Sequence, residues 1–272
     1  MGKHILLIND LPGYGKVALA AMIPVLSHMG HHIYNLPTAL VSNTLDYGSF
    51  DILGTTDYMI KTIDIWEKLE FKFDAVSTGF IVSERQAEIV SRFCENQKRK
   101  GACIFMDPIM GDEGRLYNGI GEKTISHMRR IMQSADYIVP NYTEAAYLAG
   151  MDYSEIGMNK KQSDELIERL LQAGAKSIVV TSAIVDGSDC VIVHDYKNAK
   201  TAYLPFTSLP VRFPGTGDIF SAVFTGNILN GKGLMQSAQN SMDAVKTMIE
   251  INKDNEDKFK GIPVENCLEV LK

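Results

Sequence analysis

Short apolar runs rich in β-forming residues alternate with longer amphipathic runs along this chain. Such apolar runs are typical of strands buried on both faces, and the amphipathic runs are typical of helical crossovers. The pattern therefore predicts an α/β fold of three layers, in which helices cover both faces of a mostly parallel central sheet. The predicted strands are 4–9, 32–36, 74–78, 103–107, 136–139, 177–181, 190–194 and 202–205. The predicted helices are 15–29, 57–69, 84–99, 122–134, 143–149, 160–173, 217–230, 233–252 and 263–271.

Length and composition narrow the class of protein. A chain of 272 residues, 45% of them hydrophobic, can build one large core, so we predict a single domain over residues 1–272. The formal net charge is −6 and no basic stripe is present, which argues against a nucleic-acid partner. No run resembles a membrane span or a signal peptide, and the four cysteines are widely separated, as in reduced cytosolic proteins. We therefore expect a cytoplasmic protein that binds neither nucleic acid nor membranes.

Polar residues follow several of the predicted strands. In a parallel sheet, ligands bind beyond the carboxyl ends of the strands, so these residues are expected to line one edge. They are Asn9–Asp10, Thr78–Gly79, Asp107, Asn141 and Thr181–Ser182.

The turn after the first strand resembles two nucleotide-binding loops. Gly13, Gly15 and Ala18 fit the spacing of a dinucleotide-binding turn, but no acidic residue follows at the end of the next strand to hold a ribose hydroxyl. A phosphate loop would need a glycine where Asp10 stands and a serine or threonine where Val17 stands. Both alternatives lack their second requirement, and we expect a plain turn with Asp10 facing the ligand.

A second glycine-bearing turn lies near the C-terminus. Gly215, Thr216 and Gly217 open directly into an apolar helical pattern, and free N–H groups at a helix N-terminus bind anions. Asp218 follows in the first turn of that helix. It could merely complement the helix dipole, or it could take a proton from a hydroxyl that attacks phosphorus.

This turn is part of a set of motifs in register. The segment PGTGDIFSAV resembles the C-terminal signature of the ribokinase superfamily, in its vitamin B6 and hydroxymethylpyrimidine kinase branch. Other segments are similar to that branch in the same order, and the resemblance runs from about residue 4 to 250. They are ALVSNTLDYG (39–48), STGFIVSERQ (77–86), MDPIMGDEGRLY (106–117) and VPNYTEAAYLAG (139–150).

The resemblance implies ATP-dependent phosphorylation of a hydroxymethyl group on a small heteroaromatic ring. It implies that Asp218 is the base, that the amides of residues 215–217 stabilise the transferring phosphoryl group, and that Mg²⁺ lies near Asp107 and Glu144. The implied nucleotide-side residues are Asp107, Asn141, Glu144, Thr181 and Ser182. A monovalent cation is left open, and a homodimer is expected by family analogy alone.

Each nucleotide-side residue also has a structural alternative. Asp107 could end a strand, Asn141 could cap the next helix, and Glu144 could complement that helix dipole. The glycine-bearing segment 111–117 could be a flap over nucleotide or a plain surface loop.

The substrate side departs from the pattern of the branch. The implied residues are Asp10, Thr44, Leu45, Asp46 and Phe80. Vitamin B6 kinases commonly carry hydroxyl side chains where Asp10 and Leu45 stand, so Asp10 could pair with a protonated ring nitrogen or an amine, and Thr44 could replace its neighbour. We predict a kinase of pyridoxal, pyridoxamine or pyridoxine. The alternatives are a hydroxymethylpyrimidine kinase, an NAD-dependent oxidoreductase and a ligand-binding relative without catalysis.

Overall fold

A computed structural model describes residues 2–117, 121 and 123–271, which form two compact units. The first unit joins residues 1–80 to residues 209–272. Its elements are β1 (His4–Pro12), α1 (Ala18–His28), β2 (His32–Val41), the 3₁₀ turn η1 (Leu45–Tyr47), β3 (Ile52–Gly54), α2 (Thr56–Lys68), β4 (Ala75–Thr78), α7 (Thr216–Leu229), α8 (Leu234–Asn252) and the 3₁₀ turns η2 (Val264–Asn266) and η3 (Leu268–Val270).

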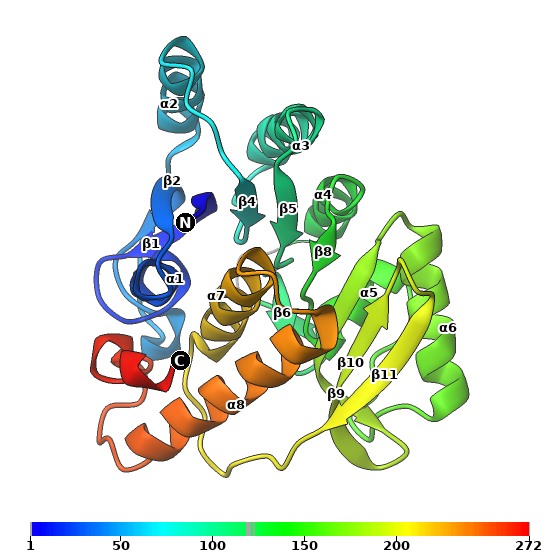
Figure 1. The fold of residues 1–272 in the computed structure, drawn as a ribbon. Helices are drawn as coiled ribbons and strands as arrows, with labels where there is room; N and C mark the ends of the chain where they lie inside the picture. Colours follow the sequence, from blue (N-terminus) through cyan, green and yellow to red (C-terminus); the bar gives the residue numbers. More distant parts are fainter. Residues whose placement is uncertain (1, 118–120, 122, 272) are drawn as a thin grey trace. The chain divides into compact units, whose positions relative to one another are not determined.

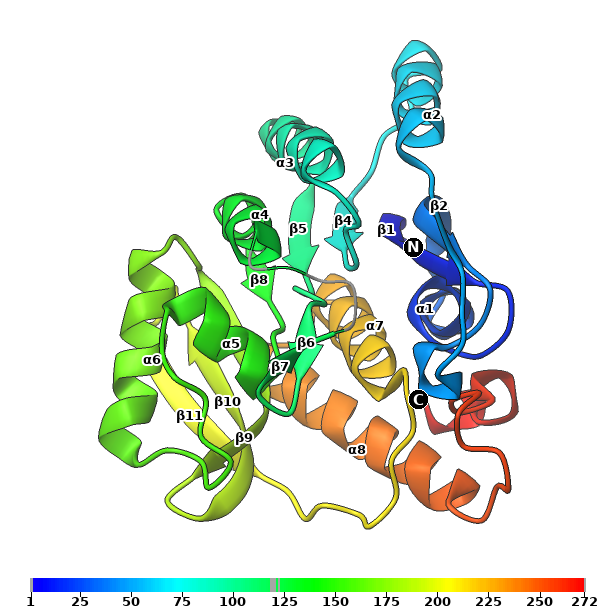
Figure 2. The same ribbon diagram turned by 180° about the vertical axis from the view of Figure 1, so that it is seen from behind.

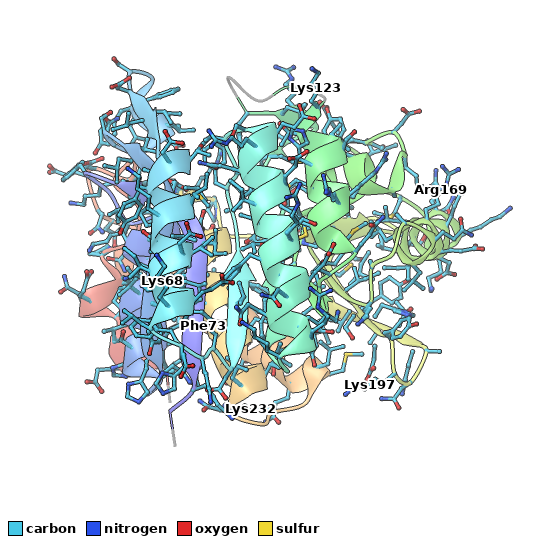
Figure 3. The ribbon with its side chains drawn as sticks, turned by 90° about the horizontal axis from the view of Figure 1, so that it is seen from above. Lys68, Phe73, Lys123, Arg169, Lys197 and Lys232 are labelled. Atoms are coloured by element: carbon cyan, nitrogen blue, oxygen red, sulfur yellow. The ribbon has the colours of Figure 1, made fainter. Side chains whose placement is uncertain are left out.

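The strands of the first unit follow the order β4-β1-β2-β3. β1 is parallel to both β4 and β2, and β3 closes the edge as an antiparallel strand. The crossovers β1–α1–β2 and β2–α2–β4 run in opposite directions along the sheet, and right-handed crossovers then place α1 and α2 on opposite faces (Figure 1). Beyond α2, Phe73 packs edge-on against Tyr34 of β2, with ring centroids 5.1 Å apart (Figure 3).

Helix α7 is the central helix of the first unit. It contacts α1 on one side and α8 on another (Figure 1). Every residue from Ile219 to Asn227 is buried, as expected for a helix that is apolar on all sides. The first turn of α7, with Asp218, is therefore held by a rigid element.

The second unit comprises residues 81–208. Its elements are α3 (Glu84–Arg99), β5 (Cys103–Met106), β6 (Gly111–Asp112), β7 (Arg115–Leu116), α4 (Lys123–Met132), β8 (Tyr137–Ile138), α5 (Tyr142–Ala149), α6 (Lys160–Gln172), β9 (Ser177–Val185), β10 (Ser188–Asp195) and β11 (Lys200–Pro205). β5, β8 and β9 are parallel, whereas β10 and β11 continue the sheet as antiparallel strands (Figure 2). Helices α3 and α4 run side by side (Figure 3).

The predicted strands are all present, and the short strands β3, β6 and β7 were not predicted. The predicted helix 15–29 begins only at Ala18, because Gly15 has a φ of +107° and Val17 is extended. Residue 122, where the helix 122–134 was predicted to start, lies outside the described residues.

The predicted helix 263–271 is wrong. That segment forms the separate turns η2 and η3, because Cys267 between them has a φ of −125°, which interrupts the helical backbone. None of the described helices is long and apolar enough to cross a membrane. The single domain over 1–272 stays a prediction.

Candidate active site

The pairing of β1 with β2 is irregular next to Asp10. Asn9 pairs with Pro37 and Leu11 with Leu40, so β2 has one residue more than β1 over this step and the irregularity lies in β2, opposite Asp10. Asn9 is only 2% exposed, and its Oδ1 accepts hydrogen bonds from the N–H groups of Asp10 (3.0 Å) and Phe80 (2.8 Å). One amide side chain thus joins two residues that were predicted to lie on the substrate side.

The two glycine-bearing turns of the sequence pack against each other. A Cβ on Gly215, which has a φ of +82°, would lie 2.3 Å from the Lys16 carbonyl oxygen. A Cβ on Gly15, which has a φ of +107°, would lie 2.3 Å from Cγ2 of Thr44. Backbone conformation and close packing therefore explain the glycine of the first turn without any bound nucleotide.

Gly217 requires a different explanation. It lies in the first turn of α7 and is exposed, and a Cβ placed on it would meet no atom within 4 Å. Gly215 is the N-cap residue, and the preceding Phe213 carbonyl accepts a hydrogen bond from the Thr216 hydroxyl (3.3 Å). The predicted anion-binding turn is thus a helix N-terminus with an open, methyl-sized space at Gly217.

Asp218 lies at the same helix end, in contact with β1 and α1. Its Oδ1 is 3.5 Å from the Asn9 side-chain nitrogen, and its carboxylate also accepts a hydrogen bond from the Ala18 N–H. Ala18 adopts a φ of +47°, an unfavourable value for alanine. Burial raises the pKa of Asp218 to about 6, although both hydrogen bonds oppose this shift.

The carboxylates of Asp10 and Asp218 repel each other. Burial and the charge of Asp218 together raise the pKa of Asp10 to about 7. Both carboxyl groups therefore titrate far above the usual range of an aspartate, and raised carboxyl pKa values of this kind are typical of acid–base sites.

The 42–47 segment is tied to the C-terminal part of the chain. The Thr44 hydroxyl donates to the Phe259 carbonyl (2.6 Å), and Thr44 is 2% exposed. This hydrogen bond gives the Thr44 hydroxyl a structural partner, and its predicted role as a substitute for the hydroxyl missing at Leu45 stays a prediction. Leu45 and the exposed Asp46 lie on η1, and the hydroxyl of the next residue, Tyr47, donates to Asp257 (2.6 Å).

In the second unit, the predicted nucleotide-side residues gather around the start of α5. Asn141 and Glu144 form a capping box: Asn141 Oδ1 accepts from the Glu144 N–H, and Glu144 Oε2 accepts from the Asn141 N–H, both at 2.9 Å. The other Glu144 oxygen accepts from the Met110 N–H (3.0 Å). The capping alternative for Asn141 is confirmed, and the phosphate contact stays a prediction.

Thr181 and Asp107 lie close to this cap. Thr181 forms a parallel bridge with Asn141, and its N–H donates to the Pro140 carbonyl (2.9 Å). Ser182 is exposed and adopts a φ of +53°. Burial, and secondly the Asp107 charge, raise the pKa of Glu144 well above its usual value. Two neighbouring carboxyl groups of this kind fit a hard cation such as Mg²⁺, which binds proteins through one or two carboxylates together with substrate phosphates.

The segment 111–117 forms a small hairpin, β6–β7, that is fastened to α5. The Gly114 N–H donates to the Thr143 hydroxyl (2.9 Å), and the Gly114 carbonyl accepts from the Tyr147 hydroxyl (3.2 Å). The Gly111 carbonyl accepts from the Asn141 side chain (2.8 Å). The segment is therefore an ordered hairpin, and not an irregular surface loop. Its predicted role as a flap stays a prediction.

Within the described ranges, no three histidine, cysteine, aspartate or glutamate side chains converge on a metal position. Thr143 could also have capped the predicted helix 143–149, but it lies inside α5, where Asn141 is the N-cap residue, and its hydroxyl accepts from Gly114. Two other residues with a part in the site had no role predicted: Asn9 and Ala18. Asn9 was noted only as a polar strand end, and no sequence signal marks the positive φ of Ala18.

Comparisons with known proteins agree with the predicted motifs. A family model described as phosphomethylpyrimidine kinase matches residues 13–262. Pyridoxal kinase PdxY of Actinobacillus pleuropneumoniae is 27% identical over 269 residues, which cover 93% of this chain and 90% of that protein. The PdxY protein of Rubrobacter xylanophilus is 26% identical, with 92% and 87% covered.

Solved structures show the same fold. A protein of Bacteroides thetaiotaomicron, provisionally assigned as a phosphomethylpyrimidine kinase and crystallised with pyridoxal, has a TM-score of 0.92 and 34% identity over 100% of this chain and 96% of its own. Pyridoxal kinase of Lactobacillus plantarum, at 24% identity, shares the fold with a TM-score of 0.87 over 99% of this chain and 96% of its own. The predicted ribokinase-like fold is confirmed, and ATP use follows from the kinase family. The chain belongs to the phosphomethylpyrimidine kinase family, in the ribokinase-like group of the pyridoxal kinases, and is a phosphotransferase with an alcohol group as acceptor.

Proposed function

We propose that this protein phosphorylates the hydroxymethyl group of a B6 vitamer, pyridoxal, pyridoxamine or pyridoxine, to the 5′-phosphate, with Asp218 as the general base. The observation that carries the proposal is the position of Asp218 in the first turn of α7, one residue after a glycine with an open face. A base with a pKa of about 6 is ionised at neutral pH and still basic enough to accept the hydroxyl proton as the bond to phosphorus forms.

The N–H groups of residues 215–217 are the groups that would stabilise the transferring phosphoryl. They lie at the positive end of the α7 dipole, where negative charge is favoured. A side chain at Gly217 would occupy the space that an approaching oxygen needs. Phosphoryl transfer depends mainly on positioning and charge stabilisation, and these two features supply both.

On the nucleotide side, Asn141, Glu144, Asp107, Thr181 and Ser182 stay the proposed residues. Mg²⁺, when bound, would neutralise phosphate charge. Asp107 and Glu144 would hold it, partly through water, and the backbone hydrogen bonds that both Glu144 oxygens accept would fix the orientation of that carboxyl group. The role of Asn141 would then be to hold Glu144 and the β6–β7 hairpin in place.

The residues proposed to surround the ring are Asp10, Thr44, Leu45, Asp46 and Phe80. Because its pKa is raised to about 7, Asp10 can donate to a ring nitrogen or hydroxyl when protonated, or pair with an amine when ionised. The PdxY relatives are pyridoxal kinases by name, and the Bacteroides relative was crystallised with pyridoxal, which supports a B6 vitamer.

A hydroxymethylpyrimidine kinase is the second candidate. The description of the matching family and the provisional assignment of the Bacteroides relative favour it. An aminopyrimidine ring offers an amine and ring nitrogens that an acidic Asp10 would also bind.

The test is ATP-dependent phosphorylation of pyridoxal, pyridoxamine, pyridoxine and hydroxymethylpyrimidine, with direct identification of the products. Asp218→Asn is run alongside, with Asp57→Asn as a matched control, because Asp57 is a first-turn acid on α2. We expect one vitamer to be preferred, the first variant to lose at least about 10³-fold in kcat, and the control to match the wild type. Turnover of hydroxymethylpyrimidine alone selects the second candidate. An active Asp218→Asn variant refutes the proposal that Asp218 is the general base.

A further inference from the structure

Asn9 occupies a position that the proposed mechanism does not yet use. It is 2% exposed at the end of β1, and its side chain contacts three different segments: its own strand, the turn after β4 and the start of α7. A buried amide that satisfies groups on several elements fixes their relative positions.

The orientation of the Asn9 amide is determined by its partners. Oδ1 accepts from two backbone N–H groups, those of Asp10 and Phe80. A side-chain NH₂ cannot accept these bonds, so the nitrogen must face the other way, where Asp218 Oδ1 lies at 3.5 Å and Met22 Sδ at 3.7 Å. The Asn9 donor is therefore directed at the proposed base by two bonds that are independent of it.

The backbone after β4 leaves space for the Asn9 side chain. A Cβ on Gly79 would lie 2.5 Å from both Cγ and Oδ1 of Asn9, so glycine at this position allows the amide to approach the backbone. On the other side of the carboxylate, the Ala18 N–H donates to Asp218. The groups that act on Asp218 are thus the Asn9 amide and the Asp10 carboxylate from β1 and the Ala18 N–H from α1.

From this geometry we infer that Asn9 is a positioning residue, which orients the Asp218 carboxylate and stabilises its ionised form for proton transfer. The inference rests on the proposed role of Asp218. At 3.5 Å the hydrogen bond is at its long limit, and we expect it to shorten when substrate closes the site. Through Oδ1 the same amide holds Asp10 and Phe80, so the base and the proposed ring-binding residues keep a fixed separation.

The test compares Asn9→Asp and Asn9→Ala with wild type in the pH profile of kcat/KM. Asn9→Asp keeps the oxygen that binds the two backbone N–H groups but replaces the donor by an oxygen that repels Asp218. We expect the acid limb to move upward by about one pH unit or more in Asn9→Asp, and by a smaller amount in Asn9→Ala. At pH 6.5 a shift of one unit should lower the kcat of Asn9→Asp about threefold, while KM changes less than kcat.

The control is Asn252→Ala. Asn252 is also a buried asparagine of the first unit. Its side-chain nitrogen donates to the Met248 carbonyl (2.8 Å) and Cys267 Sγ (3.2 Å), and its oxygen accepts from the Asn255 side chain (3.0 Å). The Asn252→Ala variant should lower the stability of the protein and leave the acid limb of the kcat/KM profile at the wild-type pH. A limb that stays at the wild-type pH in both Asn9 variants overturns the inference, even where activity falls, because a purely structural role reduces activity equally at every pH.

A second readout covers variants that turn over too slowly. NMR titration of the Asp218 carboxyl carbon reports the same upward shift without catalysis, and an unshifted titration also overturns the inference. Asp218→Asn separates the two proposals: if that variant is active, the proposed base has failed. If it is inactive and the Asn9 variants leave the Asp218 titration unchanged, only the inference about Asn9 has failed.

Discussion

Gly215 and Gly217 flank a single threonine, yet the structure predicts opposite consequences for replacing them with alanine. A Cβ on Gly215 would lie 2.3 Å from the Lys16 carbonyl oxygen, 3.0 Å from Cγ1 of Val17 and 3.1 Å from its Cα. A φ of +82° costs alanine about 1–2 kcal/mol, and the overlap with a backbone atom adds about 1–3 kcal/mol. We expect Gly215→Ala to lose about 3 kcal/mol, which lowers Tm by roughly 6–12 °C.

Gly217→Ala should leave stability intact. No atom lies within 4 Å of its added Cβ, its φ is compatible with alanine, and alanine in a helix gains about 0.5–1 kcal/mol over glycine. The methyl group would instead meet the phosphoryl oxygen that the proposal brings to this turn, with a loss of about 10²-fold in kcat/KM.

The assay is paired thermal unfolding and steady-state phosphorylation on both variants. A fully active Gly217→Ala would mean that no ligand approaches this residue, and the proposed phosphoryl site would be wrong. A Gly215→Ala variant as stable as wild type would refute the packing between the two turns. Loss of activity without loss of stability at Gly217 is the result that the reasoning requires.

Three further outcomes are expected. The wild-type kcat/KM should fall about tenfold per pH unit below pH 6, because protonated Asp218 is no longer a base; a profile flat to pH 4.5 would exclude it. The pKa of Asp10 is raised in the folded state to about 7, so the folded protein holds more protons than the unfolded chain and loses stability as pH rises through 4 to 7. Asp10→Asn should therefore be more stable than wild type at pH 8, by at most about 4 kcal/mol, and equal to it near pH 4 in denaturant titrations. Thr143→Val should speed amide exchange at Gly114 about tenfold, whereas Thr143→Ser keeps the hydrogen bond and the slow exchange.

The fold was largely predictable because its signals are local. Each buried strand is a continuous apolar run, and helix ends follow capping residues such as Ser83, whose side chain accepts from the Gln86 N–H (3.2 Å). The errors occur where local signals are weak. The strands β6 and β7 have two residues each, and their formation depends on hydrogen bonds to α5. Likewise, Cys267 interrupts the final helical pattern through its backbone conformation, which no residue type there indicates.

The candidate site divides in the same way. Gly215, Gly217 and Asp218 lie within a few positions of one another in the sequence, so a short motif identifies them. Asn9 was recognised only as a polar strand end, because its partners Phe80 and Asp218 lie 71 and 209 residues away. Contacts at such separations are made by the fold, and a pattern in one sequence does not contain them.

The turn after β1 illustrates why a spacing alone misleads. Its glycines fit a nucleotide loop, yet each is explained by a contact within the protein: Gly13 approaches the Ser42 carbonyl oxygen, and Gly15 approaches the Thr44 side chain. The backbone then passes through the strained φ of Ala18, whose N–H donates to Asp218. Strain is retained where surrounding contacts enforce it, and such positions cluster at functional sites. The turn after β1 therefore contributes to the proposed reaction by packing against the turn at residues 215–217. The residues that a phosphate loop would require are missing from this turn, and its backbone at Lys16 packs instead against Gly215 of the proposed phosphoryl-binding turn.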